Sequence, residues 1–438
     1  MKKAALHNLG CKVNAYETEA MQELLEQNGY EIVPFQEGAD IYIINTCTVT
    51  NMADRKSRQM IHRAKKMNPD AIVVAAGCYV QAQENTGELD ACIDIVIGNN
   101  KKQNLIEILE AYEQKRKEER GAFVQQEVID INHTKEYEEL HLTKTAEHTR
   151  AYIKVQDGCN QFCTYCIIPY ARGRVRSRRK AEVVEEVRTL AENGYKEVVL
   201  TGIHLSSYGV DFEEQETLLS LIEAVHEVEG IERIRLGSLE PRIITEEFAE
   251  TLASLPKICP HFHLSLQSGC EATLKRMNRR YSAGEYLEKC GLLRKYFENP
   301  ALTTDVIVGF PGETEEEFEE SREFVEKVNF YETHIFKYSK RQGTKAAVMP
   351  DQVPEPEKTR RSNILLAMDE RNRKNYEEGF SGKETEILVE ETMEKNGKTY
   401  WTGHTKEYIR LAVVSGQDLS GKLLKVTVGE DAWPVDTI

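Results

Sequence analysis

Short runs of apolar, largely β-branched residues alternate with stretches of helical spacing through residues 1–100. Two of these stretches, 16–28 and 53–67, are amphipathic and end just before Gly29 and Pro69, which are helix-stop signals. Continuous apolar runs of this length are typical of strands buried on both faces of a parallel sheet. The candidate strands are 4–10, 41–46, 71–77 and 93–97. The alternation predicts an α/β fold that begins with an open, doubly wound parallel sheet.

Residues 150–340 repeat a strand-then-helix unit about six times. Helices are indicated over 180–193 and 218–229, and Thr314 with Glu317 fits a helix capping box. The candidate strands are 152–155, 197–200, 233–237, 262–266, 304–308 and 333–338. This is too few units for a closed eight-stranded barrel, so a central partial (βα)6 barrel is predicted.

The pattern changes again near the C-terminus. A proline-rich, acidic stretch (350–357) leads into a charged helix (358–378), and four short strands punctuated by glycines follow. These strands, 385–390, 400–404, 409–414 and 423–428, predict a small β-barrel of about sixty residues. We therefore expect an N-terminal domain over 1–120, a linker over 121–148, a barrel domain over 149–378 and a β-domain over 379–438.

Bulk properties narrow the class of protein. The 438 residues carry a formal charge of −16, which argues against a globally basic nucleic-acid binder. There is no signal-peptide pattern at the start and no apolar run of membrane length, so we expect a cytoplasmic protein. Ten cysteines in such a chain indicate metal or redox chemistry rather than disulfides.

Three cysteines, Cys159, Cys163 and Cys166, have Cys-x3-Cys-x2-Cys spacing directly after an apolar strand. Three thiolates so spaced can hold three irons of a [4Fe–4S] cluster and leave the fourth iron open. The alternative is a zinc site, but no fourth cysteine or histidine follows closely. The spacing favours the cluster.

A second set of cysteines, Cys11, Cys47 and Cys78, shows no mutual spacing, yet each follows a candidate strand of the N-terminal sheet. Because the carboxyl ends of parallel strands face one crevice, these thiols are expected to converge there and hold a second cluster. Three packed core cysteines are the alternative. The remaining cysteines, Cys92, Cys259, Cys270 and Cys290, are interpreted as packing or surface residues.

A basic run follows the Cys159 loop. It consists of Arg172, Arg174, Arg176, Arg178, Arg179 and Lys180. In a chain that is acidic elsewhere, we expect Arg174, Arg176, Arg178 and Arg179 to contact polynucleotide phosphates. A solvated surface run, or pairing with acidic neighbours, is the alternative.

Several motifs in order resemble the methylthiotransferases of the radical-SAM superfamily over nearly the whole chain. They are Asn-Leu-Gly-Cys-Lys-Val-Asn (8–14), Asn-Thr-Cys-Thr-Val-Thr (45–50), Gly-Cys-Tyr-Val-Gln (77–81), Gly-Cys-Asn-Gln-Phe-Cys-Thr-Tyr-Cys-Ile-Ile-Pro-Tyr-Ala-Arg-Gly (158–173) and Gly-Phe-Pro-Gly-Glu-Thr (309–314). The stretches 46–50 and 201–209 look most like the branch that methylthiolates threonylcarbamoyladenosine in tRNA. Methylthiolation of isopentenyladenosine in tRNA or of a ribosomal-protein aspartate stays open, as does a non-catalytic zinc and RNA-binding protein.

The resemblance implies two [4Fe–4S] clusters and S-adenosylmethionine as cofactors. The barrel cluster would cleave S-adenosylmethionine to a radical that removes hydrogen from C2 of adenine, while the N-terminal cluster carries the sulfur. The residues implied in S-adenosylmethionine binding are Gly202, Ser238, Glu240, Gln267, Ser268 and Gly309. The usual Gly-Gly-Glu after the second strand is replaced here by Thr-Gly-Ile (201–203). His204, which follows, is interpreted as structural, with substrate contact as the alternative.

The resemblance also implies partners. These are tRNA, an electron donor such as flavodoxin or ferredoxin, and a source of sulfur, and no membrane is involved. The C-terminal β-domain resembles the TRAM domain, an RNA-binding module, with a purely stabilising cap as the alternative.

Overall fold

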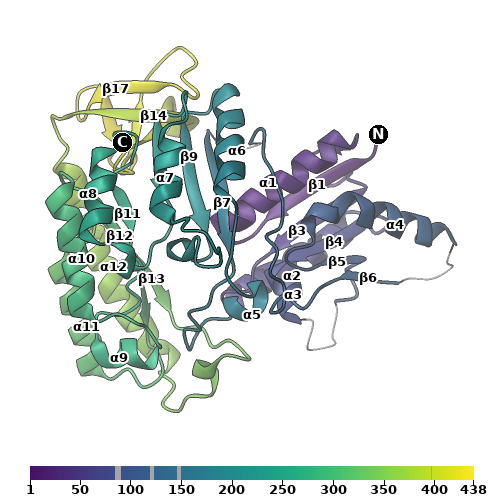
Figure 1. Cartoon of the computed structure of the whole chain (residues 1–438), viewed down its shortest axis with the longest axis horizontal. Helices are drawn as coiled ribbons and strands as arrows, with labels where there is room; N and C mark the ends of the chain where they lie inside the picture. Colours follow the sequence, from purple (N-terminus) through teal and green to yellow (C-terminus); the bar gives the residue numbers. More distant parts are fainter. Residues whose placement is uncertain (84–89, 119–122, 146–148, 396) are drawn as a thin grey trace.

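The computed structural model describes residues 1–83, 90–118, 123–145, 149–395 and 397–438. The N-terminal sheet is parallel throughout, with strand order β2-β1-β3-β4-β5-β6 (Figure 1). Its strands are β1 (Lys3–Asn8), β2 (Glu31–Ile32), β3 (Ile41–Thr46), β4 (Ile72–Gly77), β5 (Ile95–Ile97) and β6 (Gln125–Glu127).

Helices cover both faces of this sheet. Apolar residues of α1 (Lys12–Gln27) and α4 (Leu105–Glu118) pack on one face, and those of α2 (Asn51–Met67) and α3 (Cys78–Gln83) pack on the other. The predicted doubly wound sheet is therefore confirmed. The polar edge strand β6 gave no apolar signal in the sequence, because it completes the sheet by backbone pairing with β5 alone.

The central part is a partial barrel, as predicted. Strands β10, β9 and β7 pair in parallel, with the short β8 antiparallel at the edge, and β11, β12 and β13 form a second parallel group. Parallel bridges from Ile234 to Ile258 and from Leu239 to Leu264 join the two groups. The strands are β7 (Arg150–Asp157), β8 (Arg176–Ser177), β9 (Glu197–Gly202), β10 (Arg233–Leu236), β11 (His261–His263), β12 (Ala301–Val308) and β13 (Glu332–Lys337).

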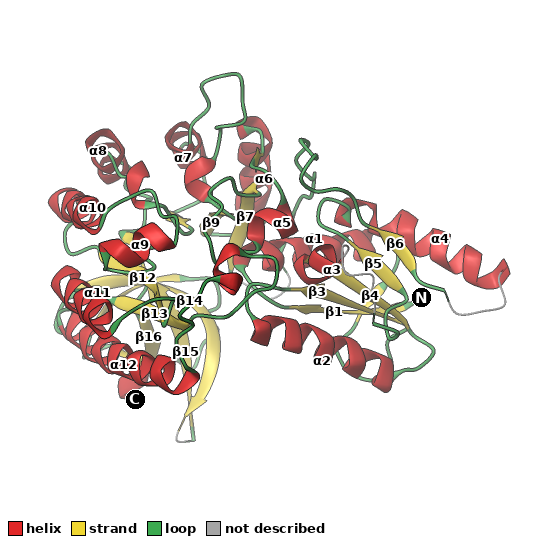
Figure 2. Ribbon diagram, turned by 90° about the horizontal axis from the view of Figure 1, so that it is seen from below, coloured by secondary structure: helices red, strands yellow, loops and turns green. Residues whose placement is uncertain are grey.

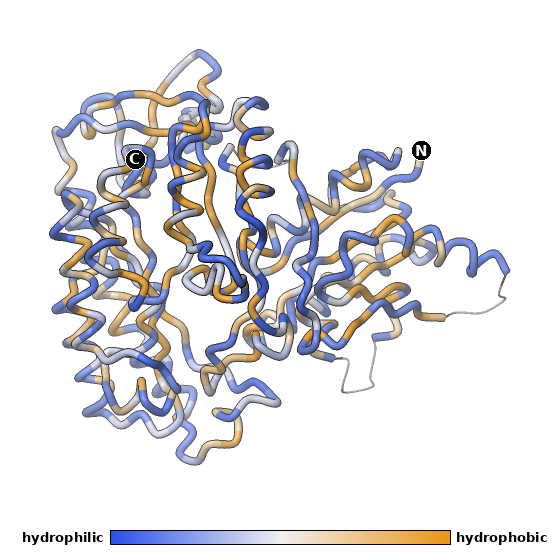
Figure 3. Tube along the Cα trace, viewed as in Figure 1, coloured by the Kyte–Doolittle hydropathy of each residue, from blue (hydrophilic) through white to orange (hydrophobic). Residues whose placement is uncertain are grey.

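Helices lie along the outer side of these strands (Figure 2). Thr314 and Glu317 form the predicted capping box at the start of α11. The helices are α5 (Ile168–Arg172), α6 (Lys180–Glu192), α7 (Leu218–His226), α8 (Glu246–Ser254), α9 (Glu271–Arg276), α10 (Ala283–Tyr296), α11 (Glu315–Val328) and α12 (Glu355–Glu378). Hydrophobic and hydrophilic positions alternate along them (Figure 3), because each buries one face against the barrel.

The C-terminal part is a five-stranded antiparallel sheet of order β17-β14-β15-β16-β18. A bridge between Val428 and Ala432 links its two edges, so the sheet curls towards closure. Its strands are β14 (Glu384–Lys395), β15 (Lys398–Thr405), β16 (Arg410–Val413), β17 (Leu423–Thr427) and β18 (Ala432–Pro434), the last of which was not predicted. No helix in the described part of the chain is long and apolar enough to cross a membrane.

Candidate active site

The three N-terminal cysteines converge. Cys47 follows β3, Cys78 begins α3 after β4, and Cys11 precedes α1. All three line one cavity of about 500 Å³. Gly10 adopts φ +116°, and a Cβ atom there would lie 3.1 Å from the Cys47 Sγ, so the turn carrying Cys11 requires glycine. The three thiols are brought together because each follows the end of a strand of the same sheet, and not by their spacing in the sequence.

The chemistry of this set suits a metal cluster. Burial raises the pKa of Cys47 to about 12, and the neighbouring Cys78 thiol acts in the same direction. Arg172 Nε donates a hydrogen bond to Cys78 Sγ at 3.2 Å, and Asn99 Nδ2 donates to the same sulfur at 3.6 Å. Thiols that disfavour one another's ionisation become thiolates when a cation binds, and the donors then stabilise the sulfur charge.

The second set lies on the loop between β7 and α5. The pKa of Cys166 is raised to about 12, mainly by burial, and the neighbouring Cys163 thiol acts in the same direction. Gly158, which precedes Cys159, has φ +70°, and a Cβ atom there would meet the Arg174 carbonyl oxygen at 1.8 Å. The loop therefore folds tightly back on the chain that leaves it.

Arg279, which the sequence interpretation missed, donates from Nη1 to Cys163 Sγ at 3.3 Å. It sits 116 residues away in the chain, in the turn after α9, where only the tertiary fold brings it to the loop. Each cysteine set thus has one arginine that donates a hydrogen bond to one of its sulfurs.

The spacing of the sulfurs bears on the choice between an iron–sulfur cluster and a single zinc ion. In neither set do all three described sulfurs lie within 4.8 Å of one another. Tetrahedral zinc, with Zn–S bonds of about 2.3 Å, requires sulfurs about 3.8 Å apart. Wider spacing, with three thiols per set, fits a three-thiolate iron–sulfur cluster.

Three cavities with shared walls connect the two sets. The largest, about 610 Å³, shares Gly10 and Cys11 with the cavity of the N-terminal cysteines. It shares Asp305 with a smaller cavity of about 190 Å³, which borders Cys166. The space between the cysteine sets is therefore lined by the barrel strands and by the Cys11 loop.

Three of the six residues predicted to bind S-adenosylmethionine border this space. Gly202 and Ser238 line the largest cavity, and Gln267, at φ +71°, lines the smallest. The described linings do not include the other three, Glu240, Ser268 and Gly309.

Each of these three has another partner. Glu240 accepts a hydrogen bond from Arg242 Nε at 2.6 Å, and Ser268 Oγ accepts one from the Cys270 amide at 3.2 Å. At Gly309 a Cβ atom would lie 2.3 Å from the Lys358 side chain, so close packing against Lys358 requires glycine at this position.

His204 lies beside the barrel loop, with Nδ1 2.7 Å from Ser207 Oγ. Burial lowers its pKa to about 4, although Glu240, 4.0 Å away, opposes the shift. The ring is therefore neutral near pH 7, and its hydrogen bond agrees with the structural interpretation.

The basic run does not form a continuous exposed surface. Arg176 and Arg178 are 0% and 1% exposed, so direct phosphate contact by these two residues is wrong. Arg176 Nη1 donates to the carbonyl oxygens of Arg172 and Arg174 at 3.0 Å, and Arg178 pairs with Glu186. Exposed Arg174 and Arg179 flank four consecutive buried residues, 175–178, so the chain around β8 is covered on both faces.

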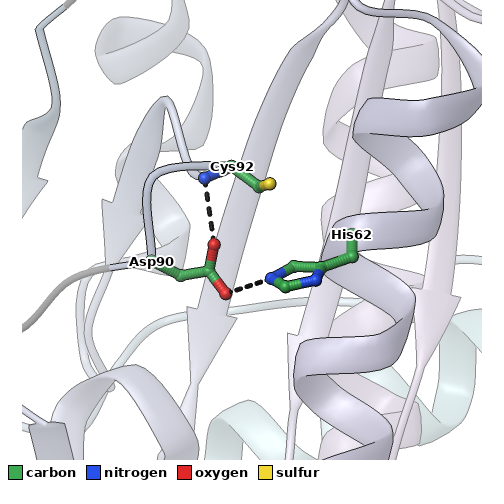
Figure 4. Close-up of side chains that lie close together, drawn as sticks. All are labelled: His62, Asp90 and Cys92. Atoms are coloured by element: carbon green, nitrogen blue, oxygen red, sulfur yellow. Dashed lines mark hydrogen bonds and ion pairs between the residues drawn. The ribbon is translucent and has the colours of Figure 1, made fainter.

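The four remaining cysteines lie apart from both sets. Cys259, Cys270 and Cys290 are buried, and burial is the largest cause of their raised pKa values. Cys92 is partly exposed beside His62 and Asp90 (Figure 4). The Asp90 carboxylate accepts a hydrogen bond from the Cys92 amide at 3.0 Å and lies 2.5 Å from His62 Nε2.

Comparisons with known proteins agree with this architecture. The model of the radical SAM superfamily matches residues 153–325, and that of the uncharacterized protein family UPF0004 matches residues 3–98. The chain is 42% identical to the threonylcarbamoyladenosine tRNA methylthiotransferase MtaB of Bacillus subtilis, covering 99% of this chain and 95% of that protein. It is 43% identical to MtaB of Aquifex aeolicus, covering 97% and 100%.

The chain belongs to the MtaB family of radical SAM methylthiotransferases. A tRNA-2-methylthio-N(6)-dimethylallyladenosine synthase of Thermoanaerobacter sp. is more distant, at 36% identity over 98% of this chain and 90% of that protein. The fold resembles the radical S-adenosylmethionine methyltransferase TsrM of Kitasatospora setae, with a TM-score of 0.58 at 16% identity over 80% of this chain and 77% of that one.

Two arginines of the basic run remain exposed in this MtaB family member. Arg174 lies over the Phe162 ring, and Arg179 pairs with exposed Glu214 at 2.6 Å. If both contact phosphates, Arg174→Ala with Arg179→Ala should flatten the log–log salt dependence of tRNA binding by about 1.8, at roughly 0.9 per contact. Filter binding across a salt series measures this slope. Exposed Arg188 on α6 is the matched control, and an unchanged slope in the double variant would contradict phosphate contact.

Proposed function

We propose that this protein attaches a methylthio group to C2 of the adenine of threonylcarbamoyladenosine, next to the anticodon of tRNA. The observation that carries the proposal is the pair of three-cysteine sets that border adjoining cavities. The identity of 42–43% to proteins named for this substrate supports the choice of nucleoside.

The roles follow from position. Cys159, Cys163 and Cys166 would hold one [4Fe–4S] cluster, and Cys11, Cys47 and Cys78 the second. When bound, the clusters and S-adenosylmethionine supply radical formation and sulfur transfer. Arg172 and Arg279 keep a positive charge beside one sulfur of each set.

The barrel residues position the reactants. Gly202 and Ser238 line the largest cavity, and Gln267 lines the smaller cavity that borders Cys166. Hydrogen transfer needs reacting atoms about 3–3.5 Å apart, so the adenine must leave its stack and enter this space. An electron donor such as flavodoxin or ferredoxin and a source of sulfur complete the reaction.

The purified, reconstituted enzyme should be given tRNA carrying threonylcarbamoyladenosine, isopentenyladenosine or unmodified adenosine. Mass spectrometry of the digested nucleosides is expected to show methylthio product chiefly from the first. Turnover of the isopentenyl substrate alone would overturn the choice of nucleoside while retaining the chemistry.

Metal analysis tests the non-catalytic alternative. Two clusters give about eight irons per chain, whereas a zinc and RNA-binding protein gives zinc and no product.

A further inference from the structure

The largest cavity between the cysteine sets has a distinctly polar lining. Histidines, acids and hydroxyl groups from β9 to β13 face the Cys11 loop across about 610 Å³, a volume suited to a modified base. Its acids lie beside histidines. Asp305 Oδ2 lies 3.2 Å from His263 Nε2, and Glu332 Oε1 lies 3.9 Å from His334 Nδ1.

Lys12 is the exception in this lining. It is the first residue of α1, directly after Cys11, and the one lysine or arginine among the described residues that line the cavity. No hydrogen bond or ion pair of its amine is found within the described residues. It borders this cavity but not the one lined by all three N-terminal cysteines. A half-buried cation without a carboxylate partner suits an anionic ligand.

Tyr408, in the turn between β15 and β16 of the C-terminal sheet, lines the same cavity. Tyr408, at φ +75°, lies between His261 and His404, with ring centroids 4.7 and 4.4 Å apart. Arg235 lies over the Tyr408 ring at 4.7 Å, but it is engaged with Glu197 and with the carbonyl oxygens of Thr405 and Lys406. This leaves Lys12 as the cation available to a ligand in the cavity.

We propose that Lys12 binds the carboxylate of the threonylcarbamoyl side chain and thereby selects this nucleoside over those with a neutral side chain. This inference rests on the proposed function and assigns recognition of the substrate's side chain to Lys12. An isopentenyl group carries no charge and would leave the amine unpaired in the cavity, which costs binding free energy.

Binding to reconstituted enzyme without S-adenosylmethionine tests this directly. Three anticodon stem-loop RNAs are compared at one salt concentration: one with threonylcarbamoyladenosine, one with its carboxylate converted to a methylamide, and one with adenosine. Wild-type protein should bind the carboxylate RNA roughly ten- to a hundredfold more tightly than the methylamide RNA, as expected for a charge-assisted hydrogen bond.

Lys12→Met should reduce the affinity for the carboxylate RNA to that for the methylamide RNA, and should leave the methylamide RNA unaffected. Lys12→Arg should retain most of the preference. Lys66→Met, an exposed lysine of the same domain, should retain all of it. The ratio of kcat/KM for the carboxylate and methylamide RNAs should fall in parallel with the affinity ratio.

Two results with the Lys12→Met variant would overturn the inference alone. One is a Lys12→Met enzyme that keeps its preference, and the other is an equal loss of affinity for all three RNAs, which indicates a general contact or a disturbed fold. Equal binding of the carboxylate and methylamide RNAs by wild-type protein would overturn it even if Lys12→Met does not fold. Failure of wild-type enzyme to convert any threonylcarbamoyl RNA, with turnover of isopentenyl RNA, would overturn the proposed function as well.

Discussion

Simultaneous replacement of Cys11, Cys47 and Cys78 by alanine is expected to abolish methylthio transfer while reductive cleavage of S-adenosylmethionine continues. The three thiols line one cavity and supply every cysteine of that site. Their loss removes one cluster and should reduce the iron content from about eight to about four per chain. Liquid chromatography would then detect 5′-deoxyadenosine, and mass spectrometry would detect no methylthio nucleoside.

The complementary triple replacement of Cys159, Cys163 and Cys166 should abolish both products, because cleavage depends on that set. Cys290→Ala is the control, since Cys290 is buried away from both sets and its replacement should leave both products in place. Methylthio product from the N-terminal triple variant would show that this set does not carry the sulfur.

Much of the fold follows from local patterns. Strands such as β3 and β4 are continuous apolar runs, and their burial on both faces is what such runs indicate. The convergence of Cys47 and Cys78 then follows from parallel topology, because both follow neighbouring strands of one sheet. Short or polar strands such as β6 and β18 depend on backbone pairing and were not apparent in the sequence.

The pairing of charged residues is where the sequence was least informative. A run of arginines is read by default as exposed, yet Arg176 and Arg178 are buried by partners that the local sequence does not identify. The same holds for Arg279, whose contact with Cys163 is created by the packing of α9 against the loop. Tertiary contacts between distant segments decide which charged residues are buried, and the local pattern of hydrophobic and polar residues does not predict these contacts.

One buried charge network holds the N-terminal sheet domain against the barrel. Glu17 of α1 has a fully buried side chain and accepts hydrogen bonds from Arg172 Nη1 and Lys154 Nζ, both at 2.8 Å. Lys102 Nζ lies 3.2 Å from its other carboxylate oxygen. Burial alone would raise the pKa of Glu17, but the three cations together hold it well below its ordinary value.

Glu17→Ala is therefore expected to destabilise the contact between α1 and β7 by about 3–5 kcal/mol, because three buried cations lose a shared carboxylate and keep only Asp157 and Glu138 as acidic neighbours. Glu26→Ala on the same helix is the matched control. Its partner Lys144, 2.7 Å away, is well exposed, so the change should cost at most about 1 kcal/mol. Hydrogen exchange of the α1 and β7 amides measures both effects in a chain of several domains.

The pH dependence of this contribution, measured towards acidic pH, is a second test of the prediction. Because the pKa of Glu17 is lower in the folded than in the unfolded chain, its contribution is complete above its ordinary pKa of 4.5 and is lost as the pH falls below that value. The difference in exchange protection between wild type and Glu17→Gln should therefore be largest near pH 7 and should narrow below about pH 4.5. A pH-independent difference, or a Glu17→Ala effect no larger than that of Glu26→Ala, would contradict a charged Glu17 as the centre of this contact. The expected result would show that the contact between the two cysteine-bearing domains depends on the buried Glu17 carboxylate. This contact also reaches the N-terminal cysteine set, because the Arg172 guanidinium that binds Glu17 donates a hydrogen bond to Cys78 as well.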